Sequence, residues 1–164
     1  MFCTYTIKTN HHYLYHHIFR WPFCSSRKIS FRAKFDSNCL YDTAITGDDI
    51  NKLYGATDYY STVHSNSVRF GWRHDGKGNI EIFAYWYVNG KRGFYKLGQT
   101  LPDQINNYEI LINDDSYYFR FDEIEFITHR TKKASGGIRF RLFPYFGGDH
   151  KDPQTSTILI ENIK

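Results

Sequence analysis

Short segments in which apolar and polar residues alternate recur along the whole chain. The clearest is KISFRAKF at residues 28–35, where the odd-numbered positions are apolar and the even-numbered positions are polar. A period of two indicates a β-strand with one face in solvent. Further strands are expected at residues 2–8, 67–73, 80–88, 91–98, 108–112, 116–121, 124–129, 138–146 and 157–163. Only DDINKLYG at residues 48–55 has a pattern that fits a helical turn.

The centre of the sequence predicts a β-hairpin. IEIFAYWYV is followed by Asn89-Gly90, a pair typical of a type I′ turn because both central residues need a positive φ. A two-residue loop pairs Tyr87 with Arg92 and Tyr85 with Phe94 across the hairpin. The expected core face carries Ile80, Ile82, Ala84, Trp86, Val88, Tyr95 and Leu97. The opposite face carries Glu81, Phe83, Tyr85, Tyr87, Arg92, Phe94 and Lys96, and it is both aromatic and basic.

Nine or ten strands without a long helix favour one all-β domain spanning residues 1–164. Two packed antiparallel sheets, a β-sandwich with jelly-roll topology, satisfy this pattern, and a closed barrel is the structural alternative. Residues 42–66 are rich in Asp, Asn, Gly, Ser and Thr, and we expect them to form a long irregular loop. The aromatic content of 19% also favours strands.

Charge and hydropathy exclude several classes of protein. The net charge is +4, and acidic residues are interleaved with basic ones, so no nucleic-acid-binding stripe is expected. No apolar run is long enough to span a membrane, so no membrane insertion is expected either. The first residues lack the pattern of a secretory signal, and Cys3, Cys24 and Cys39 follow no disulfide or zinc spacing. These features predict a protein that is cytoplasmic as synthesised, or a part of a virion.

Two sets of segments carry a resemblance to known proteins. SVRFGWR, IEIFAYWYVNG, YEILI and YYFRF are spaced as in concanavalin-A-like jelly rolls of the lectin or laminin-G type. INKLYG, RFGWR, AYWYVNG and LFPYFGGD resemble small β-sandwich proteins of gut-bacterial and phage genomes, over roughly residues 4–163. The resemblance implies glycan binding or structural attachment as a function, and it transfers no site residue.

Two loops and one histidine cluster are candidate metal ligands. Asp149 and Asp152 lie in FGGDHKDP and offer oxygen atoms to calcium, as do the carboxylates of TGDDIN at residues 46–51. Neither loop has the spacing of an EF-hand, so a structural calcium is a weak expectation and no other cofactor is expected. The histidines of HHYLYHH at residues 11–17 lack a Cys or Glu neighbour and fit a solvent-exposed loop better than a zinc site.

None of the catalytic motifs considered is complete in this sequence. DEIEF at residues 122–126 resembles the paired-carboxylate strand of jelly-roll glycosidases, but Phe121 and Ile127 occupy flanking positions where a further carboxylate is needed. A tight turn at Asp122-Glu123 explains the segment better. No phosphate-binding loop or nucleophile elbow occurs. The sequence therefore predicts that the protein is not an enzyme.

The aromatic and basic hairpin face remains as the candidate binding site. Its residues suit the apolar faces of sugars and also suit protein interfaces. The simpler alternative is a second core layer beneath residues 42–66. The leading expectation is a non-catalytic module that binds a carbohydrate or cell-surface glycan, and the alternative is an assembly protein, such as a bacteriophage virion component that self-associates. The predicted binding residues are Phe83, Tyr85, Tyr87, Arg92, Phe94 and Lys96.

Overall fold

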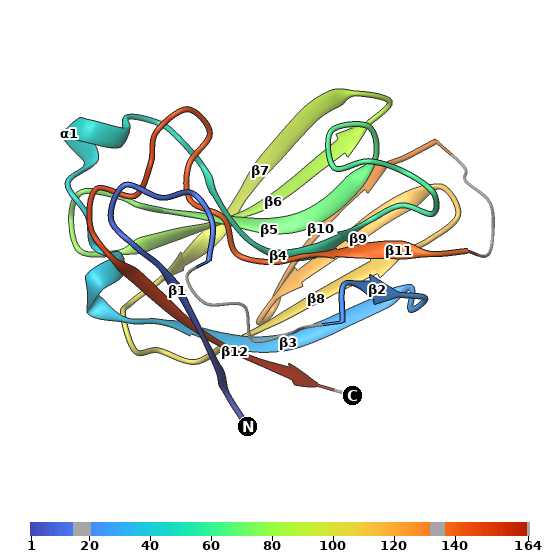
Figure 1. The fold of residues 1–164 in the computed structure, drawn as a ribbon. Helices are drawn as coiled ribbons and strands as arrows, with labels where there is room; N and C mark the ends of the chain where they lie inside the picture. The colour runs from blue at the N-terminus through green and yellow to red at the C-terminus, as the bar shows by residue number, and fades with distance from the viewer. Residues whose placement is uncertain (15–20, 132–136, 164) are drawn as a thin grey trace.

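A computed structural model describes residues 1–14, 21–131 and 137–163. Within these residues the chain forms two packed β-sheets, which Figure 1 shows as two layers of strands. The strands are β1 (Cys3–Ile7), β2 (Phe23–Cys24), β3 (Lys28–Phe35), β4 (Asn51–Thr57), β5 (Ser67–His74), β6 (Ile80–Val88), β7 (Lys91–Thr100), β8 (Asn106–Ile112), β9 (Ser116–Phe121), β10 (Ile124–His129), β11 (Arg139–Leu142) and β12 (Ser156–Ile163). The helical elements are the 3₁₀ turn η1 (Ser37–Cys39) and the single-turn helix α1 (Thr43–Thr46). Neither of these two described helices has the length or apolar character needed to cross a membrane.

Each sheet has six strands among the described residues. The first has the order β1-β12-β3-β8-β9-β10, and the second has the order β2-β11-β4-β5-β6-β7. The strand pairs with a defined register are all antiparallel. Strand β12 lies between β1 and β3, although every other strand precedes it in the sequence. The predicted all-β antiparallel sandwich is confirmed.

The core lies between the two sheets and is built largely from aromatic rings. Phe31 of the first sheet stacks on Tyr108 with ring centroids 4.9 Å apart and contacts Phe70 of the second sheet at 5.9 Å. Phe35 similarly contacts Trp72 at 5.1 Å. Aromatic pairs of this kind add about 0.5–1.5 kcal/mol each beyond the burial of their area. The high aromatic content therefore goes mainly into the layer that joins the sheets.

The central hairpin has the predicted register. Tyr87 pairs with Arg92 and Tyr85 with Phe94, as the two-residue loop requires. Asn89 and Gly90 have φ values of 51° and 78°, which is the conformation of a type I′ turn. One core assignment is wrong. Tyr95 is 51% exposed, because β7 is an edge strand and the ring stacks outside the core on Phe126 of β10, with centroids 4.4 Å apart.

The expected irregular loop at residues 42–66 contains helix α1 and the whole of strand β4. All seven residues of β4 are buried, so the strand has no solvent-exposed face to produce an alternation of apolar and polar residues. Its pairing with β5 is interrupted by a bulge between Lys52 and Gly55. A β-bulge breaks the alternation on which strand recognition depends. Strand β4 lies in the middle of the second sheet and carries one side of the candidate site.

Candidate functional site

A groove of about 670 Å³ lies on the face of the second sheet that points away from the first sheet. Residues from β4, β5, β6 and β7 form its floor, and two connecting segments form its walls. One wall is the segment that follows β11, and the other includes Val63 and His64 between β4 and β5. The charged and tyrosine side chains that line it are Tyr13, Lys52, Arg69, Tyr85, Tyr87, Arg92, Arg141, Tyr145 and Asp149.

Lys52 and Tyr145 are brought together by an isolated β-bridge. The amide of Lys52 donates to the carbonyl oxygen of Tyr145 at 2.8 Å, and the amide of Tyr145 donates to that of Lys52 at 3.0 Å. Residues that exchange both backbone hydrogen bonds lie directly opposite each other, with their side chains on one face. The bridge therefore places the two side chains on one face of the groove, with Nζ of Lys52 6.0 Å from the centre of the Tyr145 ring.

Arg69 is the most buried arginine of the groove. Its position on β5 is opposite Tyr85 on β6, and its guanidinium carbon lies 5.3 Å from the centre of that ring. The residue is 7% exposed, and its Nε has no hydrogen-bond partner within the described structure. Nor does it form an ion pair with any carboxylate of the described residues. Burial lowers the pKa of this guanidinium, so the groove holds a charge that the described chain leaves uncompensated.

Lys52 is a second buried cation. Its Nζ donates a hydrogen bond to the carbonyl oxygen of Gly147 at 2.7 Å and lies 5.2 Å from the centre of the Tyr85 ring. Burial, aided by the nearby charge of Arg69, lowers the pKa of Lys52 to about 8. A substantial fraction of this amine is therefore neutral in mildly alkaline solution, where an ordinary lysine is fully charged.

The tyrosines around these cations remain protonated. Burial raises the pKa of Tyr145, and the adjacent Tyr13, which meets it edge to face with centroids 5.1 Å apart, raises it further. Burial, together with the hydroxyl group of Tyr87, raises the pKa of Tyr85 to about 12. At neutral pH the groove therefore offers the hydroxyl donors of Tyr145 and Tyr85 beside the amine of Lys52 and the buried guanidinium of Arg69.

Asp49 fixes the wall that follows β11. Its Oδ2 accepts hydrogen bonds from the backbone amides of Gly148, Asp149 and His150 at 3.1–3.2 Å, and it lies 2.9 Å from the imidazole Nδ1 of His150. These contacts lower the pKa of Asp49 despite its partial burial. Gly147 enters the same turn at a φ of 74°, where a Cβ atom would lie 1.9 Å from the carbonyl oxygen of His150. The wall is thus held in one conformation.

The predicted binding residues divide into two groups. Tyr85, Tyr87 and Arg92 line the groove, whereas Phe83, Phe94 and Lys96 belong to the same sheet face but do not line it. Tyr85 and Phe83 are each 3% exposed and pack with Ile50, so part of this face is a small second core. Lys96 is engaged by Glu81, whose Oε1 accepts its hydrogen bond at 2.6 Å.

The sequence did not predict five of the charged and tyrosine residues of the groove, which are Tyr13, Lys52, Arg69, Arg141 and Tyr145. Arg69 alternates outward in SVRFGWR, so pairing that segment with IEIFAYWYV would have placed it beside Tyr85. Lys52 lies at a bulge, and Tyr145 belongs to a bridge between distant parts of the chain. No local pattern marks either of those two positions.

The candidate metal ligands do not assemble into a site. Asp149 is exposed at the groove, but Asp152 is fully buried, and burial raises its pKa to about 6. Among the described residues no group of three or more His, Cys, Asp or Glu side chains is arranged to hold a metal ion. Within the histidine cluster, His12 Nδ1 lies 2.9 Å from the carbonyl oxygen of Phe146, while His16 and His17 lie outside the described residues. A single exposed carboxylate does not fit calcium, which takes six to eight oxygen ligands.

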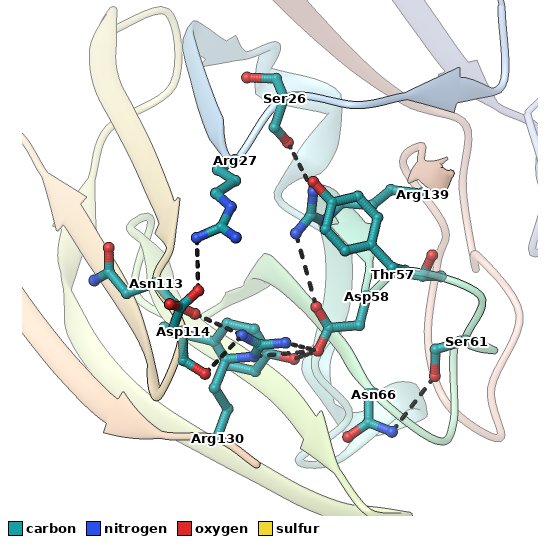
Figure 2. Close-up of polar contacts among 12 residues, drawn as sticks. Ser26, Arg27, Thr57, Asp58, Ser61, Asn66, Asn113, Asp114, Arg130 and Arg139 are labelled. Atoms are coloured by element: carbon teal, nitrogen blue, oxygen red, sulfur yellow. Dashed lines mark hydrogen bonds and ion pairs between the residues drawn. The ribbon is translucent and has the colours of Figure 1, made fainter. Parts of the chain in front are cut away.

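A separate cluster of charged residues is buried near the end of the sandwich where β4 and β10 terminate. Figure 2 shows Asp58 between the guanidinium groups of Arg130 and Arg139. Arg130 donates from Nε and Nη2 to Oδ2 of Asp58, and it also reaches the carbonyl oxygen of Asn113. Tyr117 of β9 donates its hydroxyl to the same carboxylate at 3.0 Å. Asp58 is 1% exposed, so this cluster joins the two sheets and offers no access to a ligand.

Comparison with known proteins gives matches at the level of structure. No family model matches the chain, and no curated protein matches it. The Bacteroides ovatus mixed linkage glucan GH16 protein is similar at a TM-score of 0.57, with 11% identity over 99% of this chain and 81% of that one. The alginate lyase AlyC3 has a TM-score of 0.57 and 8% identity over 99% of this chain and 74% of that one. The laminarinase catalytic domain of Thermotoga maritima has a TM-score of 0.53 and 11% identity over 84% of this chain, which spans 62% of its length. The fold is a jelly-roll β-sandwich.

These neighbours correct two predictions. The sequence predicts a non-catalytic binding module, with an assembly protein as the alternative, and it predicts that the chain is not an enzyme. Both predictions are wrong, because the three similar solved structures named above are, by name, carbohydrate-active enzymes. Their names agree with a glycan as partner, but they give no support to a virion role or to the finer resemblance to gut-bacterial and phage proteins. Sequence identities of 8–11% show a shared fold and do not transfer a function.

Proposed function

We propose that this protein cleaves an acidic polysaccharide, one built from uronate residues, by β-elimination in the groove. The observation that carries the proposal is Arg69, a buried guanidinium that forms no ion pair within the described residues, close to Lys52, a buried amine whose pKa is lowered to about 8. An uncompensated buried charge destabilises a protein by several kcal/mol, so its presence needs a functional reason. A substrate carboxylate provides one. The alginate lyase among the structural neighbours acts on a polymer of uronates, which fits the same chemistry.

Hydrolysis is the competing reaction for this fold, and the groove is poorly equipped for it. Glycoside hydrolysis uses two carboxyl groups on opposite sides of the scissile bond. Among the described residues that line the groove, Asp149 is the one carboxylate. Glu81 lies on the same sheet face, but Arg73 and Lys96 both bind it, at 2.6 Å each. The charge of the groove thus favours elimination over hydrolysis.

Each group of the groove matches one requirement of elimination. Arg69 binds the uronate carboxylate and withdraws charge from it, which acidifies the proton on C5 of the sugar. The neutral amine of Lys52, available because its pKa is about 8, takes that proton. The hydroxyl of Tyr145, whose pKa is raised, donates a proton to the leaving O4 as the C4–O4 bond breaks. A C4=C5 double bond forms, and proton exchange between the ammonium and the phenolate restores the site.

Ultraviolet absorbance of the unsaturated uronate product tests this proposal. The purified chain is incubated with polymannuronate, polyguluronate, polygalacturonate and hyaluronan, and laminarin serves as a neutral glucan assayed for new reducing ends. We expect absorbance to rise with at least one polyuronate and to be lost in Lys52→Met, Arg69→Met and Tyr145→Phe. Arg32→Met is the matched control, because Arg32 lies on the first sheet in an ion pair with Glu161.

The alternative outcomes each overturn the proposal. New reducing ends without absorbance would show hydrolysis in place of elimination. Absence of both signals on every polymer would remove the assignment, provided that circular dichroism shows a folded β-protein. Activity that survives in Arg69→Met would separate catalysis from the buried cation on which the proposal rests.

A further inference from the structure

An exposed aromatic residue, Trp21, lies beyond the end of the groove at β11. Strand β2 pairs with β11 through Phe23 and Phe140, and the amide of Arg141 donates to the carbonyl oxygen of Pro22 at 2.7 Å. Continuing the Phe23–Phe140 register by two residues places Trp21 opposite Leu142, a residue that lines the groove. Since alternate residues share a face, Trp21 lies on the same side of the sheet as Phe23.

A line of directly paired positions crosses the second sheet from edge to edge. From Leu142 on β11 the register leads through β4, β5 and β6 to Phe94 on β7. The paired positions are Leu142, Gly55, Arg69, Tyr85 and Phe94, and the extended register of β2 and β11 adds Trp21 beside Leu142. Strands in a sheet are spaced by about 4.8 Å, so the row is roughly 24 Å long from the β2 side to β7. The buried cation of the groove lies near its middle, and an exposed aromatic ring lies at each end.

The ring at the β2 end belongs to an exposed aromatic cluster. Trp21 is 65% exposed and meets Phe23 edge to face, with centroids 5.7 Å apart. Phe23, 37% exposed, contacts Phe140, which is 43% exposed, at 5.3 Å. Exposed aromatic clusters of this kind usually mark binding sites, because water contact with the rings is unfavourable. The rings brace one another, so the indole of Trp21 is presented in a defined position.

We infer that Trp21, supported by Phe23 and Phe140, forms a distal subsite that stacks on a sugar ring of the polysaccharide held in the groove. This inference rests on the proposed function. A pyranose ring presents an apolar face of C–H groups, to which the face of an indole is complementary. The occupant is the same polysaccharide chain, because the platform continues the row of positions that crosses the groove. Short substrates that fill only the central part of the row do not reach Trp21.

Binding energy from a distal ring serves catalysis only for substrates long enough to use it. We therefore expect Trp21→Ala to lower affinity and kcat/KM for oligouronates of six or more residues roughly tenfold, which corresponds to the loss of one good contact. Uronate disaccharides and trisaccharides should show no change. Trp21→Phe should recover much of the loss, because a smaller aromatic face remains. Tyr60→Ala is the matched control, since Tyr60 is 77% exposed but lies outside the row.

Fluorescence provides a direct test, because the chain has only three tryptophans. Trp72 is fully buried and Trp86 is packed against the core, so acrylamide quenches mainly Trp21. The quenching experiment uses the Lys52→Met variant, which should keep the fold of the sheet but not cleave the ligand during the measurement. We expect an oligouronate hexamer to protect the emission from acrylamide, and a disaccharide to leave quenching unchanged.

The outcomes separate the inference from the proposed function. If the wild type cleaves polyuronates and Trp21→Ala keeps the wild-type kcat/KM on both long and short substrates, the subsite is refuted and the elimination stands. If the wild type binds long oligouronates through Trp21 but yields no unsaturated product, the proposed function fails and the subsite stands. If the folded wild type binds none of these polymers, both are refuted.

Discussion

Replacing Lys52 by methionine tests whether the groove holds its cation at a cost to stability. Burial lowers the pKa of Lys52 from an ordinary 10.5 to about 8. The unfolded chain keeps the ordinary value, so at neutral pH the unfolded state binds this proton more tightly than the native state does. The loss of stability caused by burying the charged amine is complete below pH 8, and it disappears as the pH rises toward 10.5. From these values we expect this group to add about 2 kcal/mol to the free energy of unfolding between about pH 7 and pH 9.5.

The Lys52→Met variant removes this dependence on pH. At about pH 7 it removes a penalty of about 3 kcal/mol. It also leaves the carbonyl oxygen of Gly147 without its donor, which costs about 1–3 kcal/mol. The variant should therefore be as stable as the wild type, or more stable by up to about 2 kcal/mol, while losing activity. Trading activity for stability in this way is common when a buried charge serves function.

Urea unfolding followed by tryptophan fluorescence at the two pH values provides the assay. The informative quantity is the change with pH in the difference between wild type and variant, because other titrating groups then cancel. Lys34→Met is the control, since Lys34 lies on the first sheet and pairs with Asp103 at 3.3 Å. Parallel pH dependences for wild type and Lys52→Met would refute the assignment of a depressed pKa, and with it the role of Lys52 as a base.

Three further predictions concern other parts of the molecule. Asp58→Asn should lower the free energy of unfolding by about 3–5 kcal/mol, because it leaves two buried guanidinium groups without a counter-charge; Asp48→Asn, at a fully exposed carboxylate, should have little effect in the same urea titration. The double change Tyr85→Ala with Tyr87→Ala should cost several kcal/mol in a thermal melt, since Tyr85 is 3% exposed and core aromatic truncations cost about 3–5 kcal/mol each. Burial raises the pKa of Asp152 to about 6, so the contribution of this group to the free energy of unfolding should fall by about 2 kcal/mol as the pH rises from 4 to 6, and Asp152→Asn should lack this loss in acid-side unfolding curves.

Contrary results would be informative in each case. A near-neutral Asp58→Asn would mean that the buried arginines are hydrated or mobile. A double tyrosine variant with unchanged melting would show that this sheet face is a free platform rather than partly a core layer. If the free energy of unfolding depends on pH in the same way in the wild type and in Asp152→Asn, the Asp152 carboxylate is exposed to water.

The hairpin at Asn89-Gly90 could be predicted in register because a two-residue turn fixes its own geometry and both strands adjoin it. Strand β3 could also be predicted from the sequence, since its polar face lies toward solvent and apolar and polar residues alternate along it. Strand β4 could not, because every residue of it is buried and a bulge interrupts its pairing. Local patterns report exposure, so a strand without an exposed face is hidden from them.

The groove was only half predictable for a related reason. Tyr85, Tyr87 and Arg92 follow from the hairpin alone, because their positions depend on neighbours in the sequence. Lys52 and Tyr145 meet through a bridge between distant segments, which no local pattern specifies. Paired carboxylates do not mark this groove either, because Asp149 is the one carboxylate among its described lining residues. Uncompensated burial of Arg69 is a property of the folded chain, and it appears only once the strands are placed.

The position of β12 has a consequence for how the protein is made. This strand lies between β1 and β3, yet every other strand precedes it in the sequence. While the ribosome is still translating the earlier segments, β3 presents an unpaired edge and β1 has no partner in the sheet. Such edges invite pairing with other chains. The first sheet can close only after β12 has left the ribosome, so a nascent chain stalled before residue 156 should depend on chaperones and be prone to aggregation.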